Sequence, residues 1–251
     1  MIKKLLRASL LAIITISSSH ALEIAGDEAF PPYSFKEGGK LTGIYTDIVN
    51  SALKQMGEQH KILAVPWKRG LNDLEKQKID ALFPPYYRPK ERPYIAYSTD
   101  ILAEKLVIFC HKDKAQNLNN FPADYKGYSI GQNSGFSSGA AINDAKASGI
   151  IRLSEVRSTT ANLKKLINKR LDCYVNDRLS IKYELAKLQK AGLYDGKSIV
   201  ETHTLSTEKA YLGINVKANA EIKAFLTRFN QQIESMKANG EIEKIVARYT
   251  N

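Results

Sequence analysis

The strongest indication of the architecture lies in residues 23–56, which run EIAGDEAFPPYSFKEGGKLTGIYTDIVNSALKQM. Residues 23–26 form a short run typical of a strand, and the prolines and glycines at 31–32 and 38–39 then mark turns. From Asp47 to Met56 the apolar residues return at helical spacing, as Ile48, Val49, Ala52, Leu53 and Met56. A strand, a turn-rich excursion and an amphipathic helix are therefore expected at the start of an α/β arrangement.

The same alternation continues to the end of the chain. Short strand-like runs are expected at 61–65, 79–83, 106–109, 128–131, 171–175 and 211–216. Amphipathic helices are expected at 67–74, 138–147, 160–167, 179–189 and 222–236, with Thr160 as the N-cap of the third. Strands that alternate with helices are typical of α/β layers, and two such series in this length predict an α/β protein of two lobes.

The N-terminus has the pattern of a secretory signal. Lys3, Lys4 and Arg7 precede an apolar run over 8–16, and small residues follow up to Ala21. This order predicts a signal peptide over residues 1–21, cleaved after Ala21. The apolar run is much shorter than the roughly 20 residues of a membrane span, and neither cysteine lies close enough to accept a lipid. We therefore expect a soluble periplasmic protein.

The formal charge of +11 raises the question of nucleic-acid binding. The basic residues, however, alternate with acidic ones along the helical stretches 54–61 and 221–248. Such spread charge is typical of a solvated face, and an exported protein seldom meets nucleic acid. No nucleic-acid partner is expected.

The two cysteines, Cys110 and Cys173, lie far apart and form no C-x-x-C pattern. Zinc needs about four clustered ligands, whereas His60, His111 and His203 are scattered singly. An oxidising compartment favours a disulfide between the two cysteines over two buried thiols. We expect no metal and no other cofactor.

One catalytic pattern is present. Residues 135–139, GFSSG, fit G-x-S-x-G, and Asp177 and His203 follow in the order that a triad with Ser137 needs. Against a serine hydrolase, residues 132–134 separate the motif from the preceding strand, whereas a nucleophile elbow is a sharp turn at the strand end. The hydrolase is kept as an alternative.

Several segments together resemble a known family. They are AFPPYSF at 29–35, LTGIYTDI at 41–48, KIDA at 78–81, ER at 91–92 with YSTD at 97–100, the glycines at 131 and 135, and LD at 171–172 leading to Asp177. In order and spacing they resemble the family 3 extracellular solute-binding proteins, which include the polar amino-acid-binding proteins of lysine/arginine/ornithine, histidine and glutamine uptake. The resemblance covers essentially all of the mature chain.

The resemblance implies a type II periplasmic-binding-protein fold, with two lobes joined by two crossing segments. Residues 22–102 and 207–251 would form a discontinuous first lobe, and residues 103–206 the second. The strands that carry Cys110 and Cys173 would be neighbours in one sheet. The ligand would be clamped between the lobes of a monomer, whose closure an ABC-type membrane permease then recognises.

The resemblance also implies a binding site. Arg92 matches the arginine that holds the α-carboxylate of the ligand, and its guanidinium offers a bidentate fork for that purpose. Ser137, at a helix N-terminus, would add donors to the same carboxylate. Asp177 would pair with the α-ammonium. The alternatives are a surface ion pair of Arg92 with Glu91 or Asp100, and simple helix capping by Ser137 and by Asp177.

Further residues would complete the pocket. Phe30 matches an aromatic that stacks on the ligand, Trp67 could form a wall or belong to the core, and Asp27 lies near a position that meets a basic ligand side chain. The segment 84–87, PPYY, departs from the small and hydroxyl residues usual in the family. Its prolines lack N–H donors and Tyr87 would add an aromatic face, so a smaller or differently shaped pocket is expected.

The predicted function is non-enzymatic capture of a small amino acid or related carboxylate, with delivery to an ABC-type permease. Two alternatives stay open. The family includes periplasmic cyclohexadienyl dehydratases, for which Asp27 or Glu28 with Lys68 would be the acid/base candidates. The protein could also be a sensor subunit that presents its closed form to a membrane receptor instead of a permease.

Overall fold

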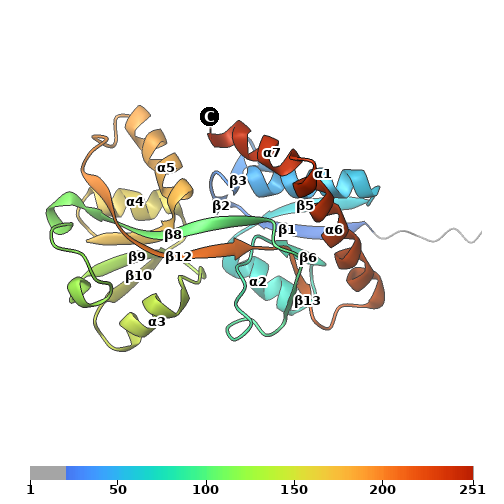
Figure 1. Ribbon diagram of the computed structural model, residues 1–251, viewed down its shortest axis with the longest axis horizontal. Helices are drawn as coiled ribbons and strands as arrows, with labels where there is room; N and C mark the ends of the chain where they lie inside the picture. Colours follow the sequence, from blue (N-terminus) through green and yellow to red (C-terminus); the bar gives the residue numbers. More distant parts are fainter. Residues whose placement is uncertain (1–20, 251) are drawn as a thin grey trace, which may run out of the picture.

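A computed structural model describes residues 21–250 of the chain, so the predicted signal peptide over 1–21 lies outside the described residues except for Ala21. The chain forms two α/β lobes side by side (Figure 1), which confirms the two-lobe organisation. No helix among the described residues is long and apolar enough to cross a membrane.

The first lobe is built on a five-stranded sheet with helices on both faces. Its strands, in order across the sheet, are β5 (His60–Val65), β1 (Leu22–Asp27), β6 (Ala81–Phe83), β13 (Gly213–Asn215) and β7 (Ile95–Tyr97). Its helices are α1 (Ile44–Met56), α2 (Trp67–Glu75), α6 (Ala220–Ala238) and α7 (Glu241–Thr250). Successive side chains of a strand point to opposite faces: Ile24 packs into the cluster under α1, α6 and α7, and Ala25 into the one under α2. A small sheet of β2 (Ala29–Phe30), β3 (Ser34–Glu37) and β4 (Lys40–Thr42) connects β1 to α1.

The second lobe repeats this layered plan. Its strands, in order, are β10 (Arg152–Val156), β9 (Ser129–Asn133), β11 (Cys173–Asp177), β8 (Leu102–His111) and β12 (Ile199–Ala210). Its helices are α3 (Gly139–Ala147), α4 (Thr159–Ile167) and α5 (Arg178–Lys190), with short 3₁₀ turns at Lys112–Lys114 and Ala123–Tyr125. Successive residues of β8 again pack into hydrophobic clusters on opposite faces of the sheet. Ile108 packs with Ile142 of α3, and Val107 packs with Leu163 of α4.

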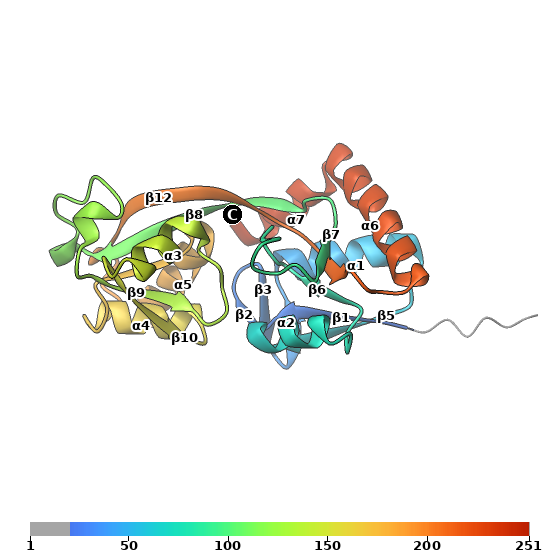
Figure 2. The ribbon, with the colours of Figure 1, turned by 90° about the horizontal axis from the view of Figure 1, so that it is seen from below.

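Two long antiparallel strands connect the lobes. Strands β8 and β12 pair from Leu102 opposite Ala210 to His111 opposite Ile199, and they run along one side of the molecule across both lobes (Figure 2). The predicted lobe boundaries, after Leu102 and after Ser206, fall within these two strands. We propose that this ladder is the pair of crossing segments.

A disulfide joins Cys110 of β8 to Cys173 of β11. The two residues are direct partners in the antiparallel pairing of these strands, with their Cα atoms 4.0 Å apart. Directly opposed residues on neighbouring strands lie close enough for a bridge. The bond ties the central strand of the second lobe to the strand that crosses between the lobes.

The N-cap of α4 differs from the prediction. Ser158, not Thr160, is the capping residue, and its hydroxyl accepts a hydrogen bond from the backbone N–H of Ala161 at 3.2 Å. Thr160 lies inside the first turn and donates to Glu184 of α5. Both residues have hydroxyls suited to a cap, and the sequence offers no way to choose between positions two residues apart.

Candidate functional site

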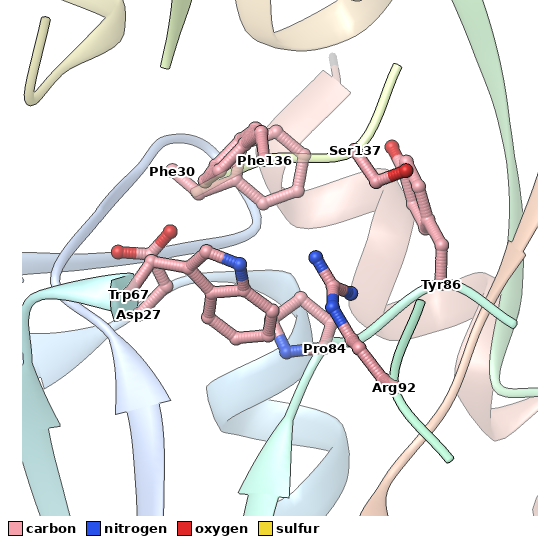
Figure 3. A pocket seen from close by; sticks show the side chains of 8 residues that line it. All are labelled: Asp27, Phe30, Trp67, Pro84, Tyr86, Arg92, Phe136 and Ser137. Carbon is pink, nitrogen blue, oxygen red and sulfur yellow. The ribbon is translucent and has the colours of Figure 1, made fainter. Parts of the chain in front are cut away.

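A cavity lies between the two lobes, at the carboxyl ends of their strands. Asp27 ends β1, Trp67 follows β5, Pro84 follows β6, and Phe136 and Ser137 follow β9 of the other lobe. Open α/β sheets place ligands at this edge. The remaining lining residues are Phe30, Tyr86 and Arg92 (Figure 3). The space between the lining residues is about 310 Å³, part of which is open to solvent.

Arg92 is a buried cation at one end of this cavity. Its side chain is only 6% exposed, its Nη2 donates to the backbone oxygen of Gly135 at 3.2 Å, and its guanidinium lies over the Trp67 ring at 5.6 Å. No acidic side chain forms an ion pair with it in the part of the chain that the structure describes. Burial lowers the pKa of Arg92 because it penalises the charged form. Asp100, considered as a partner from the sequence, pairs with Lys209 and Lys237 instead.

The loop after β9 places residues of the second lobe at the cavity. Gly135 has φ +82°, and a Cβ at this position would lie 2.6 Å from Cγ of Lys68, so glycine is required. The Gly135 oxygen accepts hydrogen bonds from both Trp67 Nε1 and Arg92 Nη2. The two lobes therefore make direct contact at the cavity.

Ser137 lines the cavity and is bonded across the lobes. Its hydroxyl accepts from Arg88 Nε at 3.0 Å, and Arg88 also forms an ion pair with Glu208 of β12 at 2.8 Å. The N-cap residue of α3 is the next residue, Ser138, whose hydroxyl donates to Gln132. Ser137 is thus placed at the helix start, as predicted, but it does not cap the helix.

Three aromatic rings form the walls of the cavity. Phe136 stands almost perpendicular to Phe30, with centroids 5.3 Å apart, and almost perpendicular to Trp67, with centroids 6.2 Å apart. Phe30 and Trp67 come from the first lobe and Phe136 from the second. The aromatic enclosure is therefore complete only when the lobes are together.

Asp27 lies at the other side of the cavity from Arg92 (Figure 3). It is 2% exposed, and its Oδ1 accepts from the backbone N–H of Ala29 at 3.0 Å. Burial raises the pKa of Asp27 to about 7, partly offset by that hydrogen bond. A cation that entered the cavity would favour the ionised form of this carboxyl.

The structure does not bring Asp177 to the cavity. Its side chain is 1% exposed and caps α5, with Oδ1 accepting from the N–H of Ser180 at 2.9 Å and Oδ2 from the N–H of Lys105 at 3.1 Å. Burial raises the pKa of Asp177 to about 6. The helix-capping alternative considered from the sequence is the arrangement found, because both carboxylate oxygens already have backbone donors.

Tyr87 is also outside the cavity, whereas its neighbour Tyr86 lines it. Tyr87 is 55% exposed and packs against Tyr97 and Tyr211 on the outer surface. Tyr86 pairs with Ala210 of β12 and its hydroxyl donates to Glu104, a buried acid whose pKa is raised well above its usual value by desolvation. Adjacent residues of extended backbone point opposite ways, so only one of the two tyrosines can face inward.

Pro84, Tyr86 and Phe136 line the cavity but were not predicted individually from the sequence. Pro84 and Tyr86 belong to the segment identified as unusual, but nothing in the sequence fixes which of its residues point inward. A large aromatic between two glycines in the 135–139 motif was an available signal for Phe136.

The catalytic arrangements considered from the sequence are not assembled. Ser137 is bonded to Arg88, Asp177 caps α5, and His203 packs against Phe121. Of the dehydratase candidates, Glu28 pairs with Arg157 and Lys68 pairs with Glu155, while Asp27 lines the cavity and forms no ion pair among residues 21–250. Both ion pairs join one lobe to the other. Within residues 21–250 there is also no cluster of three or more metal-ligating side chains.

Comparison with known proteins agrees with this geometry. The chain is 25% identical to the L-arginine-binding protein of Pseudomonas aeruginosa, over 97% of this chain and 93% of that protein. It is 23% identical to the ABC transporter arginine-binding protein 1 of Escherichia coli K12, over 97% of each. A crystal structure of a histidine kinase sensor domain with similarity to periplasmic binding proteins superposes with a TM-score of 0.76, at 16% identity, over 91% of this chain and 95% of that one.

The fold is therefore the two-lobe fold of periplasmic binding proteins. The family model described as bacterial extracellular solute-binding proteins, family 3, matches residues 22–251. This match takes in both lobes, the crossing strands and every residue that lines the cavity. The chain belongs to the family 3 bacterial extracellular solute-binding proteins.

Proposed function

We propose that this protein captures a small amino acid or related carboxylate in the periplasm and delivers it to an ABC-type membrane permease. The observation that carries the proposal is Arg92, a guanidinium that is 6% exposed, faces the cavity and has no acidic partner among the described residues. A buried charge without a partner is costly. A carboxylate that enters the cavity supplies the partner and, through the planar fork of the guanidinium, a bidentate geometry.

Two further points support transport over catalysis. Both curated relatives are named as arginine-binding proteins, and one of them as part of an ABC transporter. Of the acid and base candidates, Glu28 and Lys68 are engaged in ion pairs between the lobes, which leaves Asp27 without a base among them. The predicted signal peptide supports export to the periplasm.

The lobes supply the means of capture. Phe136 and Ser137 face Phe30, Trp67 and Arg92 across the cavity, so a bound ligand contacts both lobes at once. A ligand that bridges the lobes stabilises the closed form relative to the open one, by its difference in affinity for the two forms. The closed form is then the state that the permease recognises.

Thermal unfolding against a panel of small molecules tests the proposal. The panel contains α-amino acids, matched acids that lack the amine, and matched amines that lack the carboxylate. A ligand of the folded state raises the melting temperature. We expect shifts only from compounds with a carboxylate; equal shifts from the amines without one would contradict the proposal.

A further inference from the structure

The end of the second lobe that lies farthest from the first lobe is a surface of connecting segments (left side of Figures 1 and 2). It lies beyond the end of β8 and at the amino ends of β9, β10 and β11, opposite the strand ends that face the cavity. We call this surface the distal pole and define it by the segments 112–128, 144–152, 168–172 and 191–198.

The segments of the distal pole are joined into one surface. The backbone N–H of Lys112 donates to the oxygen of Ser198 at 2.8 Å. The N–H of Gly127 donates to the oxygen of Ile150 at 2.7 Å. Lys169 forms an ion pair across two segments with Asp113, at 2.6 Å. Side chains that are far apart in the sequence are therefore held side by side at this end of the lobe.

Exposed cations gather on the distal pole. Two of its eight basic residues, Lys114 and Lys169, pair with Asp172 and Asp113. The other six are exposed and form no ion pair with the residues that the structure describes: Lys112, Lys126, Lys146, Arg152, Arg170 and Lys197. The last turns of α4 and α5, directly behind this surface, add four further lysines and no acid.

The acidic side chains of the distal pole are fewer and mostly engaged. There are five of them, against eight cations. Asp113 and Asp172 are the partners in the two ion pairs, and Asp124 and Asp195 each accept two backbone N–H groups of their own turns. Asp144 of α3 is the remaining acid. The surface therefore has an excess of positive charge.

An apolar side chain lies among these cations. Leu193, in the turn between α5 and β12, is 55% exposed, and Val200 at the start of β12 is 36% exposed. A single exposed leucine on a protein surface needs no explanation. An exposed leucine beside several unpaired lysines and arginines, however, is the combination that lies at the surface of anionic membranes.

The shape of the distal pole favours a bilayer over a narrower partner. Its cations come from four segments spread across one end of the lobe, and their long side chains can each reach a separate phosphate in a plane of lipid headgroups. An acidic protein surface would attract the cations but would give Leu193 no apolar layer to enter. A lipid bilayer provides both.

We propose that the distal pole binds the surface of a bilayer that contains anionic lipids, with its cations at the headgroup phosphates and Leu193 inserted between them. The contact leaves the ligand cavity free, because the cavity lies at the other end of the strands of this lobe. It would hold the protein at the membrane that contains the permease proposed above. The membrane contact itself does not depend on the identity of the ligand.

Sedimentation of the protein without residues 1–21 together with lipid vesicles tests this proposal. Vesicles of phosphatidylglycerol and phosphatidylcholine in equal parts are compared with vesicles of phosphatidylcholine alone. We expect at least about tenfold tighter binding to the anionic vesicles at low salt, since each basic residue near the surface contributes. Salt at about 0.3 M should reduce this preference, because it screens exposed charges.

Charge removal at the distal pole is compared with equal charge removal elsewhere. The pole variant combines Lys112→Gln, Lys126→Gln, Arg152→Gln and Lys197→Gln. The control variant changes four lysines of the first lobe to Gln, each exposed and without an ion pair among the described residues: Lys54, Lys76, Lys78 and Lys223. The pole variant should bind anionic vesicles about tenfold more weakly than the parent, and the control variant less than about threefold more weakly.

The apolar contact has its own test. Leu193→Ser should weaken binding to the anionic vesicles by about threefold, because it removes the side chain that enters the bilayer. Val216→Ser is the matched control, since Val216 is 40% exposed on the first lobe. It should bind as the parent does. Melting curves show that each variant is folded.

Three results would overturn the proposal. The first is a parent protein that binds both kinds of vesicle equally or binds neither. The second is an equal loss in the pole and control variants, which would show that net charge alone attracts the protein. The third is binding to poly-glutamate, lost in the pole variant, without binding to anionic vesicles, which would assign the distal pole to an acidic protein surface.

Discussion

Asp27 is the residue whose environment has the most direct consequence for binding. It is fully enclosed between the end of β1 and the aromatic walls, and desolvation raises its pKa to about 7. Glu28 and Arg157 are the charged groups near it, and they act in opposite directions. The empty protein therefore holds Asp27 largely protonated at pH 6 and largely ionised at pH 8.

The affinity for a cationic ligand should depend on this ionisation. A bound cation favours the carboxylate, so binding releases a proton below the pKa of about 7. We expect the affinity for a zwitterionic ligand to rise as the pH increases from 6 to 8, by up to about tenfold. Calorimetry across this range measures it, and Asp27→Asn should remove the dependence. An unchanged pH profile in the variant would show that another group is responsible.

The same pKa predicts an effect on stability. The pKa of Asp27 in the folded state lies above the ordinary aspartate value of 3.8, so the folded form binds more protons than the unfolded form between about pH 4 and 7. Neutral Asp27 therefore stabilises the folded form at low pH. The free energy of unfolding falls as the pH rises through this window, by about 1.4 kcal/mol for each pH unit. Urea unfolding of the empty protein should find Asp27→Asn more stable than the parent at pH 8 and no different near pH 4. A less stable variant at pH 8 would contradict this account.

At the scale of residues, the sequence predicted most of the residues around the cavity but not which way each side chain points. Arg92, Phe30, Trp67, Ser137 and Asp27 lie around it because their segments follow or end strands, and strand ends can be predicted from hydrophobic patterns. Tyr87 and Asp177 lie elsewhere. Whether a side chain faces in or out after a strand depends on backbone angles of one or two residues, which the pattern does not contain.

The crossing strands show the same limit at the scale of elements. The sequence predicted 106–109 within β8 from its apolar run but gave no signal for β12. Strand β12 has mostly exposed or half-exposed residues and is held by its pairing with β8 along its whole length. A strand that is stabilised by backbone pairing, without a buried face, has no hydrophobic alternation to detect.

The disulfide is the element-scale feature with a measurable contribution. It joins two cysteines that are 63 positions apart in the sequence and so restricts the unfolded chain. We expect the double substitution Cys110→Ala with Cys173→Ala to lower the free energy of unfolding by about 2–5 kcal/mol. Denaturant unfolding measures this, with the reduced parent protein as the comparison.

Ligand affinity should change little in the same variant. Cys110 lies near the end of β8 that is far from Leu102, and neither cysteine lines the cavity. A loss of binding in a variant that is still folded would show that the bridge positions the second lobe for closure. A loss of stability below about 1 kcal/mol would mean that the unfolded chain is already restricted without it.

At the scale of the whole molecule, the lobes are held together by contacts between chain segments far apart in sequence. Glu28 pairs with Arg157 and Lys68 with Glu155, while Arg92 and Trp67 bond to Gly135. Ion pairs with exposed side chains contribute little individually, so we expect the two between the lobes to leave room for a ligand to shift the balance between open and closed forms. The sequence predicted two lobes from two α/β series, but their contacts require the folded geometry.

We propose that Arg92 holds the carboxylate of the ligand between the lobes. The measurement is calorimetric titration of the parent, Arg92→Ala and Arg92→Lys with the carboxylate that gives the largest thermal shift, and with Arg69→Ala, an exposed arginine of α2, as control. Removing one partner of a buried charge pair costs about 2–5 kcal/mol, so Arg92→Ala should bind at least tenfold more weakly. Arg92→Lys should recover only part, because an ammonium lacks the bidentate fork. Parent-like affinity in a folded Arg92→Ala protein would contradict the account.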